Sequence, residues 1–329
     1  MSLNLLSLFC GAGGLDLGFT NQGFNVNLAI DLSQAAIDTH RANFYGSNAQ
    51  THDLLELGIP GLLALCKENF DIDEPIGIIG GPPCQGFSRG NIGSSKDDPR
   101  NQLALFYIQA ISALKKTFNI EFIVFENVLG IRDKKHQDIY NEIIDSLNNL
   151  SFEVSENELN AANFGVPQIR KRIIIIAIKK RESSNKISFS NLTTHKTVKE
   201  AISGLPEPIF YEKGILPSDI PYHPNHWTMK PKSKKFLDTA SFHNKNRSFR
   251  AISWDKPSPT VAYGNREIHV HPDKKRRLSI HESLLLQGFP KDFVLSGTLS
   301  QQVTQVSNAV PPPMAEGIAK EIKRVIRRA

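Results

Sequence analysis

The stretch Leu6-Ser7-Leu8-Phe9-Cys10-Gly11-Ala12-Gly13-Gly14 decides the fold. Its apolar residues predict a short strand, and its glycines allow a tight turn into a helix that begins at Gly14. An acidic residue, Asp31, follows a second apolar run about twenty residues later, where open α/β sheets bind ribose hydroxyls. The amides of the turn face a ligand in such sheets. The pattern indicates an adenosine-containing cofactor.

One position departs from the dinucleotide-binding pattern. Asp16 stands where the third glycine would be, and a glycine turn is often only a turn. A nucleotide-dependent oxidoreductase that uses the glycine turn is an alternative function. The missing third glycine argues against it.

The first half of the chain alternates short apolar runs with longer amphipathic segments, which predicts an α/β fold with an open, mainly parallel sheet. The expected strands are Leu3 to Phe9, Val26 to Ile30, Ile76 to Ile79, Phe122 to Glu126 and Arg172 to Ile178. The expected helices are Gly14 to Asn21, Ser33 to Asn43, Leu103 to Lys116 and Gln137 to Leu150.

The character of the chain changes after about Lys180, where prolines, scattered aromatics and basic residues replace the helical period. We place a second, smaller domain at 181–301. A helical pattern returns from Gln302, with helix initiation expected at the triple proline Pro311 to Pro313. This C-terminal helix, 302–329, is expected to pack onto the first domain, 1–180.

Composition limits the class of protein. The chain has 329 residues, of which 40% are hydrophobic, so it is long enough for one large or two modest domains. Its longest apolar runs are too short to span a bilayer and no leader pattern is present, so we expect a cytoplasmic protein. Cys10, Cys66 and Cys84 form no Cys-x-x-Cys pair, so we expect free thiols, no disulfide framework and no metal site.

The net charge is +6, and basic residues cluster in the C-terminal half. The clusters suit a phosphate backbone, and a solvated basic face without a partner is the alternative. They comprise Lys230, Lys232, Lys234, Lys235, Arg247, Arg250, Lys274, Lys275, Arg276 and Arg277.

The segment Gly80-Gly81-Pro82-Pro83-Cys84-Gln85-Gly86-Phe87-Ser88 follows the apolar strand Ile76 to Ile79 directly. Prolines restrain the backbone before the cysteine, and Gly86 to Arg100 predicts a long mobile loop after it. A nucleophile held at a sheet edge under a closing loop fits this arrangement. Most free cysteines are small buried hydrophobes, but the setting of Cys84 favours the nucleophile.

A carboxylate and two arginines follow later strands. Glu126 ends an apolar run at the carboxyl edge of the sheet. Burial of its charge there costs free energy unless the carboxylate takes part in function or is paired. Arg170 and Arg172 lie two residues apart at the entrance of another strand, so their side chains point the same way. They are candidates to grip a phosphate or to orient Glu126, and an exposed strand entrance is the alternative.

With these residues in place, the sequence resembles the bacterial cytosine-5 DNA methyltransferases of restriction-modification systems over nearly its whole length. The matching motifs occur in the order of that family. They are Phe9 to Gly14, Asp31, Asp53, Pro82 to Gln85, Glu126-Asn127-Val128, Gln168 with Arg170 and Arg172, Arg276 to Pro290, and Gln305 to Pro311.

The resemblance implies a Rossmann-like S-adenosylmethionine-dependent fold and a mechanism that includes base flipping. Cys84 would add to carbon 6 of cytosine, Glu126 would hold the N3 edge, and Arg172 with Arg170 would orient Glu126. S-adenosyl-L-methionine would be the cofactor. Its implied binding residues are Phe9, Gly11, Gly13, Gly14, Asp31, Asp53, Pro83, Leu103 and Asn308. Ser7 and Leu32 depart from common family residues, which affects the expected cofactor affinity and not the reaction type.

The resemblance also implies partners. Duplex DNA is the expected substrate, a restriction endonuclease is a possible functional partner, and a monomer is expected. The implied DNA-binding residues are Ser88, Arg89, Arg247, Arg250 and Arg266. His226 and Trp227 are open between base contact and small-domain core. A transfer-RNA methyltransferase of the same fold and a non-catalytic DNA-binding regulator remain alternatives.

Overall fold

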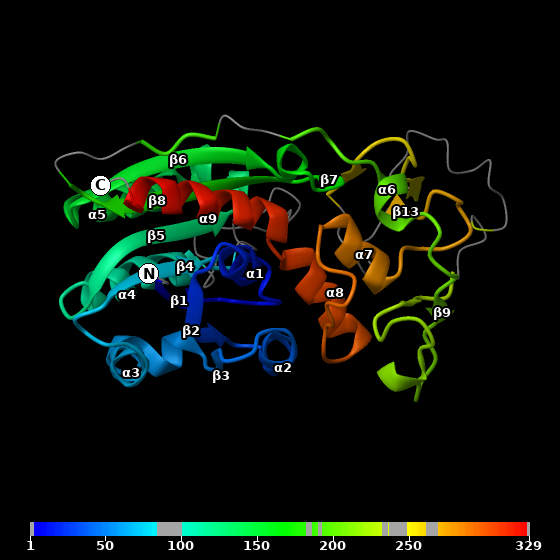
Figure 1. Cartoon of the computed structure of the whole chain (residues 1–329), viewed down its shortest axis with the longest axis horizontal. Coiled ribbons are helices and arrows are strands. Elements are labelled where there is room, and N and C mark those ends of the chain that lie inside the picture. The colour runs from blue at the N-terminus through cyan, green and yellow to red at the C-terminus, as the bar shows by residue number, and fades with distance from the viewer. Residues whose placement is uncertain are drawn as a thin grey trace.

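The computed structural model describes residues 3–83, 101–181, 186–189, 193–231, 236, 249–260 and 269–327. Its centre is a seven-stranded sheet in the order β3-β2-β1-β4-β5-β8-β6 (Figure 1). The strands β3, β2, β1, β4 and β5 are parallel, and β8 and β6 run antiparallel to their neighbours. Their bounds are β1 Asn4–Leu8, β2 Asn25–Asp31, β3 Asn48–Thr51, β4 Pro75–Gly80, β5 Asn119–Asn127, β6 Phe152–Asn160 and β8 Lys171–Lys179.

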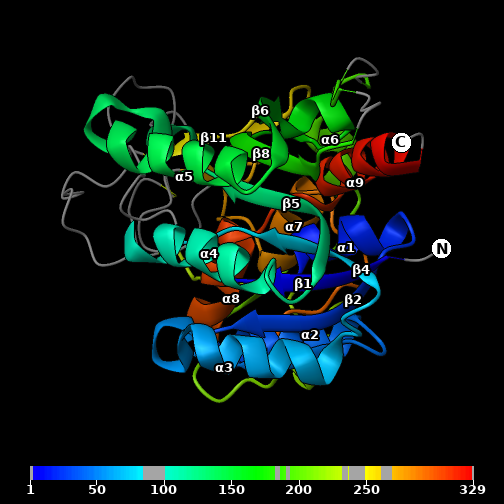
Figure 2. The same cartoon turned by 90° about the vertical axis from the view of Figure 1, so that its left-hand side faces the viewer.

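Helices cover both faces of this sheet (Figure 2). One layer holds α3 (Leu54–Asn69), α4 (Asn101–Leu114) and α5 (Gln137–Asn149), which share a hydrophobic cluster with the strands. The opposite layer holds α1 (Gly14–Asn21), α2 (Gln34–Asn43) and α9 (Pro312–Arg327). The α/β prediction is confirmed.

The apolar runs of the sequence are central strands buried on both faces. In β5, Phe122 and Val124 pack on the α1 and α9 side, whereas Ile123 and Phe125 pack on the α4 and α5 side. This alternation follows from the two-residue period of a strand. It explains why the four residues from Phe122 to Phe125 are all apolar.

The expected strands and helices are found within a few residues of their predicted bounds. The elements that were not predicted include β3, α3 and β6. The strand β6 lies at the sheet edge and pairs only with β8, so most of its side chains meet solvent. Its polar sequence gave no strand signal for that reason.

The later part of the chain builds a third hydrophobic cluster with few regular elements. Trp227 and Ile252 lie in it, together with residues of α6 (Val198–Ile202), α7 (Ile280–Leu286) and α8 (Leu299–Asn308). The short strands are β7 Gln168–Ile169, β9 Ile209–Phe210, β10 Trp227–Thr228, β11 Arg250–Ala251, β12 Ser258–Pro259 and β13 His269–Val270. Short 3-10 helices cover Leu129–Arg132, Lys134–His136, Ala161–Phe164 and Pro217–Asp219.

The C-terminal segment, predicted as one helix over 302–329, forms two helices, α8 and α9. The break at Ala309 to Pro311 follows from the triple proline, because proline cannot donate a helical hydrogen bond. Helix α9 packs on α1: a Cβ on Gly18 of α1 would lie 2.4 Å from Ala315 Cβ. Helix α8 packs instead in the third cluster.

Across the parts of the chain that the structure describes, no helix has both the length and the apolar character needed to cross a membrane.

Candidate active site

A cavity of about 490 Å³ lies at the carboxyl ends of β1, β2, β4 and β5. Helix α8 contributes part of its wall, including Thr304, Ser307 and Asn308. The sequence-predicted residues that line it are Phe9, Gly11, Gly14, Asp31, Asp53, Pro83, Leu103, Asn308, Glu126 and Arg172. Residues predicted for cofactor binding and for chemistry therefore share one site.

Asp31 ends β2 and is held by backbone amides. The Gly11 N–H donates to Oδ2 at 2.9 Å, and the Ser33 N–H donates to Oδ1 at 2.8 Å. Burial raises the pKa of this carboxyl, and the amides of Ser33 and Gly11 oppose the rise. Each oxygen has a further lone pair, so Asp31 can accept hydroxyl hydrogens from a ribose.

Backbone conformation and close packing restrict the three glycines of the turn in different ways. Gly11 has φ +54°, and a Cβ there would meet nothing within 4 Å. Gly13 does not line the cavity; its φ is +77°, and a Cβ would lie 2.5 Å from the Phe44 ring. A Cβ on Gly14 would lie 2.1 Å from the Val310 carbonyl oxygen. Close packing therefore requires Gly13 and Gly14, whereas Gly11 leaves room beside the cavity.

Asp53 caps helix α3, since its Oδ1 accepts the Leu55 N–H at 2.9 Å and the Glu56 N–H at 3.4 Å. Two exposed leucines stand near the two acids on the cavity wall: Leu32 is 67% exposed and Leu55 is 44% exposed. They give the cavity an apolar rim.

A buried polar group behind the glycine turn was missed by sequence reasoning. Asp16 lines the cavity, accepts the Ser7 hydroxyl at Oδ1 (2.7 Å) and bonds His40 Nε2 at Oδ2 (2.9 Å). The sequence showed Asp16 only as a missing glycine. Its partner His40 comes from α2, and no local pattern connects the two residues.

Glu126 and Arg172 form an ion pair at the cavity wall, with Arg172 Nε 2.9 Å from Glu126 Oε1. Burial raises the pKa of Glu126, and the charges of Arg172 and Arg170 oppose the rise. A carboxyl with a raised pKa holds a proton more readily than an ordinary glutamate. Glu126 is thus paired with Arg172.

The chain that leads to Cys84 is fixed against Glu126. Asn127 Nδ2 donates to the Pro82 carbonyl at 3.3 Å, and a Cβ on Gly81 would lie 2.8 Å from Glu126 Oε2. Pro83 lines the cavity. Cys84 and the predicted loop Gly86 to Arg100 lie outside the described residues.

Arg170 has a different partner from Arg172. Its side chain is 1% exposed, and Nη2 donates to the carbonyls of Ser307 (2.8 Å) and Asn308 (3.3 Å) at the end of α8. Its guanidinium thus bonds the cavity wall, and its charge opposes the rise in the pKa of Glu126.

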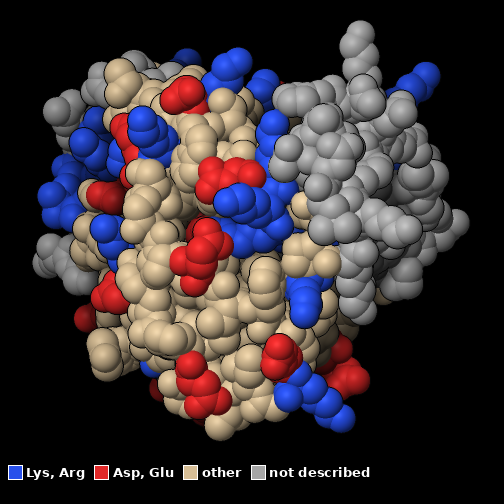
Figure 3. Space-filling model, turned by 90° about the vertical axis from the view of Figure 1, so that its right-hand side faces the viewer, with Lys and Arg blue, Asp and Glu red and all other residues tan. Residues whose placement is uncertain are grey.

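Among the predicted DNA-binding residues, Arg250 is exposed on β11, whereas Ser88, Arg89, Arg247 and Arg266 lie outside the described residues. Lys and Arg side chains lie among Asp and Glu on the described part of the face that Figure 3 shows. Trp227 and His226 are 3% and 1% exposed, which supports their interpretation as core.

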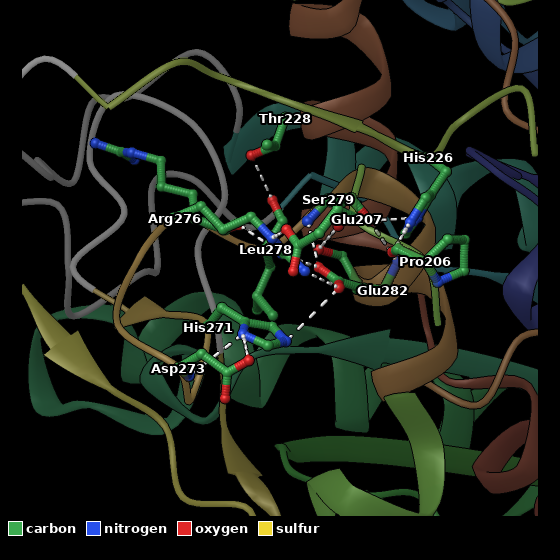
Figure 4. A network of polar contacts seen from close by, with 12 residues as sticks. Pro206, Glu207, His226, Thr228, His271, Asp273, Arg276, Leu278, Ser279 and Glu282 are labelled. Carbon is green, nitrogen blue, oxygen red and sulfur yellow. Dashed lines mark hydrogen bonds and ion pairs between the residues drawn. The ribbon is translucent and has the colours of Figure 1, made fainter. Parts of the chain in front are cut away.

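Arg276 departs from the predicted basic cluster because it is buried. Its guanidinium forms two hydrogen bonds of 2.9 Å with the Glu282 carboxylate, within the network that Figure 4 shows. Glu282 also caps α7 by accepting the Ser279 N–H. Arg276 therefore holds the third cluster together and is not available to a phosphate. The described residues contain no cluster of side chains suited to a metal ion.

The chain is similar to known proteins over nearly its whole length. The family model of the C-5 cytosine-specific DNA methylases matches residues 3–324. The chain is 34% identical to the Type II methyltransferase M1.HphI of Haemophilus parahaemolyticus, over 99% of this chain and 88% of that protein. It is 33% identical to the Type II methyltransferase M.MthTI of Methanothermobacter thermautotrophicus, over 98% of each chain.

A solved structure from E. coli, described as a prophage-encoded DNA modification methyltransferase, is similar with a TM-score of 0.79 and 28% identity. The similarity covers 99% of this chain and 100% of that one. It supports the Rossmann-like fold of S-adenosylmethionine-dependent methyltransferases. The chain belongs to the C-5 cytosine-specific DNA methylase family and is a DNA cytosine-5 methyltransferase.

Proposed function

We propose that this protein methylates carbon 5 of a flipped-out cytosine within a short duplex DNA site, through a covalent adduct of Cys84 at carbon 6 of the base. The observation that carries the proposal is the Glu126 and Arg172 pair, which shares one cavity with Pro83, the residue before Cys84.

The cavity suits S-adenosyl-L-methionine. Asp31 offers two carboxylate oxygens for ribose hydroxyls, and Leu32 and Leu55 offer an apolar rim for an adenine ring. The open space at Gly11 leaves room for the methionine part. Phe9, Asp53, Leu103 and Asn308 complete the proposed binding residues. The cofactor supplies a methyl group on a positively charged sulfur.

The proposed reaction begins with the attack of Cys84 on the base and ends with its release. The Cys84 thiolate forms a bond to carbon 6, and the electron pair of the 5,6 double bond becomes available at carbon 5. Glu126, whose raised pKa favours a bound proton, donates to N3 and neutralises the charge that develops on the ring. Carbon 5 then takes up the methyl group, and S-adenosylhomocysteine would leave as the demethylated form of the cofactor. Loss of the carbon 5 proton to solvent, expulsion of the Cys84 thiolate and return of the N3 proton to Glu126 restore the neutral ring of 5-methylcytosine.

Arg172 holds the Glu126 carboxyl in place through its Nε contact, which orients the proton for N3. A paired cytosine hides its N3 edge and carbon 6, so the base must leave the helix to reach this cavity. We assign duplex binding to the segment 181–301, with Arg247, Arg250 and Arg266 among its contacts and Ser88 and Arg89 near the base. Residues 1–180 and 302–329 form the catalytic part of this proposal.

The similarity to Type II methyltransferases supports protection of host DNA from a partner restriction endonuclease. The proposal takes the protein to act as a monomer, because one catalytic part and one duplex-binding segment serve one flipped base. To test that role, the gene of this protein would be deleted in cells that carry the gene of the partner endonuclease. We expect the host DNA to lose its protection from cleavage.

The decisive experiment measures transfer of labelled methyl from S-adenosylmethionine to unmethylated duplex DNA and to transfer RNA, followed by base-resolution mapping. We expect 5-methylcytosine at one short DNA site, and no transfer by Cys84→Ser. Cys66→Ala is the matched control, because Cys66 is buried in the cluster beneath the sheet and does not line the cavity. Label on RNA alone would favour the transfer-RNA enzyme. Cofactor binding without transfer would favour the non-catalytic regulator.

A further inference from the structure

Arg170 is a buried arginine at the junction of the sheet and the third cluster. It lies between β7 and β8, and its guanidinium lies against the carboxyl end of α8, where Nη2 donates to the Ser307 and Asn308 carbonyls. The last carbonyls of a helix have no partners within the helix, and a cation favours that end of the helix dipole. Arg170 thus holds the last carbonyls of α8 in place.

The end of α8 is also part of the cavity wall. Ser307 and Asn308 line the cavity, as does the chain from Gly80 to Pro83, and Ala309 and Val310 continue the wall. A shift of Arg170 would therefore move the wall that faces the proposed cofactor.

The backbone next to Arg170 is bonded to the later part of the chain. Strand β12 pairs with β7, the Ser258 N–H donates to the Pro167 carbonyl at 2.9 Å, and Thr260 Oγ1 donates to the Ile169 carbonyl at 2.7 Å. On the other side, the Arg170 N–H donates to Asn160 Oδ1 at 3.1 Å. Arg170 thus lies one residue from a direct bond to segment 249–260.

The same helix is held at two further points. Trp227 Nε1 donates to Gln302 Oε1 at 2.8 Å, and Thr39 Oγ1 donates to Gln305 Oε1 at 2.7 Å. Helix α8 is therefore bonded to the third cluster, to α2 and to Arg170 at once, so it moves only if these contacts move together.

We propose that Arg170 is a positioning residue that couples DNA binding by segment 249–260 to the cofactor cavity, by way of β12, β7 and the end of α8. The inference rests on the proposed function, which assigns that segment to DNA and the cavity to the cofactor. Coupling of this kind is reciprocal: if DNA tightens cofactor binding, the cofactor tightens DNA binding by the same factor.

The test measures the dissociation constant of S-adenosylhomocysteine by calorimetry, alone and with a saturating amount of sheared unmethylated duplex DNA. This ligand permits binding without turnover. We define the DNA effect as the dissociation constant without DNA divided by that with DNA, and we expect it to be at least five for the wild-type protein. Arg170→Met should weaken binding of S-adenosylhomocysteine at least tenfold and bring the DNA effect close to one. Arg170→Lys should recover part of the affinity and part of the DNA effect.

Two variants separate coupling from simple loss of structure. Thr260→Val removes an exposed hydroxyl, so we expect binding without DNA to change less than twofold while the DNA effect falls at least threefold. Arg172→Lys is the matched control, because Arg172 lies two residues farther along the chain, in β8. We expect this variant to lower kcat and to retain the DNA effect. In steady state, Arg170→Lys should raise the KM for the cofactor more than it lowers kcat.

The inference is overturned if DNA does not change cofactor affinity in the wild-type protein, or if the Thr260→Val and Arg170→Lys proteins keep the wild-type DNA effect. Thr260→Val decides the matter if Arg170→Met does not fold. Absence of any cofactor binding by the wild-type protein would instead contradict the proposed function itself.

Discussion

Arg172 Nε and Glu126 Oε1 lie 2.9 Å apart, and their side chains are only 12% and 11% exposed. The two residues come from adjacent antiparallel strands, in which Glu126 pairs with Ile174. The ion pair is thus set by the register of β5 and β8. This geometry makes the pair a rigid part of the cavity wall.

Replacing Arg172 with Gln should lower kcat about 100-fold or more, in the range expected for loss of a positioned acid or base. The variant leaves Glu126 buried without its nearest cation, so the pKa of Glu126 should rise further. Single-turnover methyl transfer across pH 5.5 to 9 measures both effects. Arg172→Lys should recover part of the rate, and a wild-type rate for Arg172→Gln would contradict the assigned role.

Gly14→Ala should weaken cofactor binding at least tenfold and lower the free energy of unfolding by about 1–3 kcal/mol, the usual cost of overpacking. The added Cβ would strike the Val310 carbonyl oxygen, which is backbone and cannot rotate away. Calorimetric binding and chemical denaturation measure the two effects. Gly204→Ala is the control, because a Cβ there meets nothing within 4 Å, although its φ of +78° carries some strain. It should leave cofactor binding unchanged.

The Arg276 and Glu282 pair should show strong coupling in a double-mutant cycle. Arg276→Met leaves a buried carboxylate that is 1% exposed, so we expect a loss of about 3–5 kcal/mol in unfolding free energy. The double variant Arg276→Met with Glu282→Leu should lose less than the sum of the single variants. Urea denaturation of the four proteins tests this, and additive losses would mean that the ion pair does not hold the third cluster.

Acid should destabilise the protein through two stacked histidines. Burial lowers the pKa of His223 to about 4 and that of His281 to about 3, and their ring centroids lie 3.9 Å apart. In the unfolded chain the two histidines take up protons near pH 6.5, whereas in the folded chain they stay neutral until the pH falls to about 4 and about 3. The stability present above pH 6.5 is therefore lost as pH falls toward 4.

We expect the free energy of unfolding to be about 1–3 kcal/mol lower at pH 5.5 than at pH 7.5. This size follows because a pKa difference of one unit between the folded and unfolded states corresponds to about 1.4 kcal/mol for each histidine. The charged or titratable neighbours are His226 and Asp292 near His223, and His226 and Lys291 near His281. His281→Phe keeps a ring in the stack and should flatten the pH dependence. An unchanged pH dependence in that variant would exclude this pair as the cause.

Much of the fold and of the candidate site could be predicted from local sequence. The apolar runs that end at Phe9, Ile30, Ile79 and Phe125 mark strands buried on both faces, and the acids and glycines directly after them lie at the cavity. The polar edge strand β6 could not be predicted, because only its place in the sheet makes it a strand.

The sequence by itself determined which residues stand at the ends of the strands, since a two-residue period and a glycine turn act over a few neighbouring positions. The tertiary structure alone decided which partner each of those residues meets. Arg170 and Ser307 are 137 residues apart, and Thr39 and Gln305 are 266 apart. Likewise, only packing buries Arg276 against Glu282 and joins Asp16 to His40. Such contacts depend on how the whole chain closes around its cores, which no local pattern encodes.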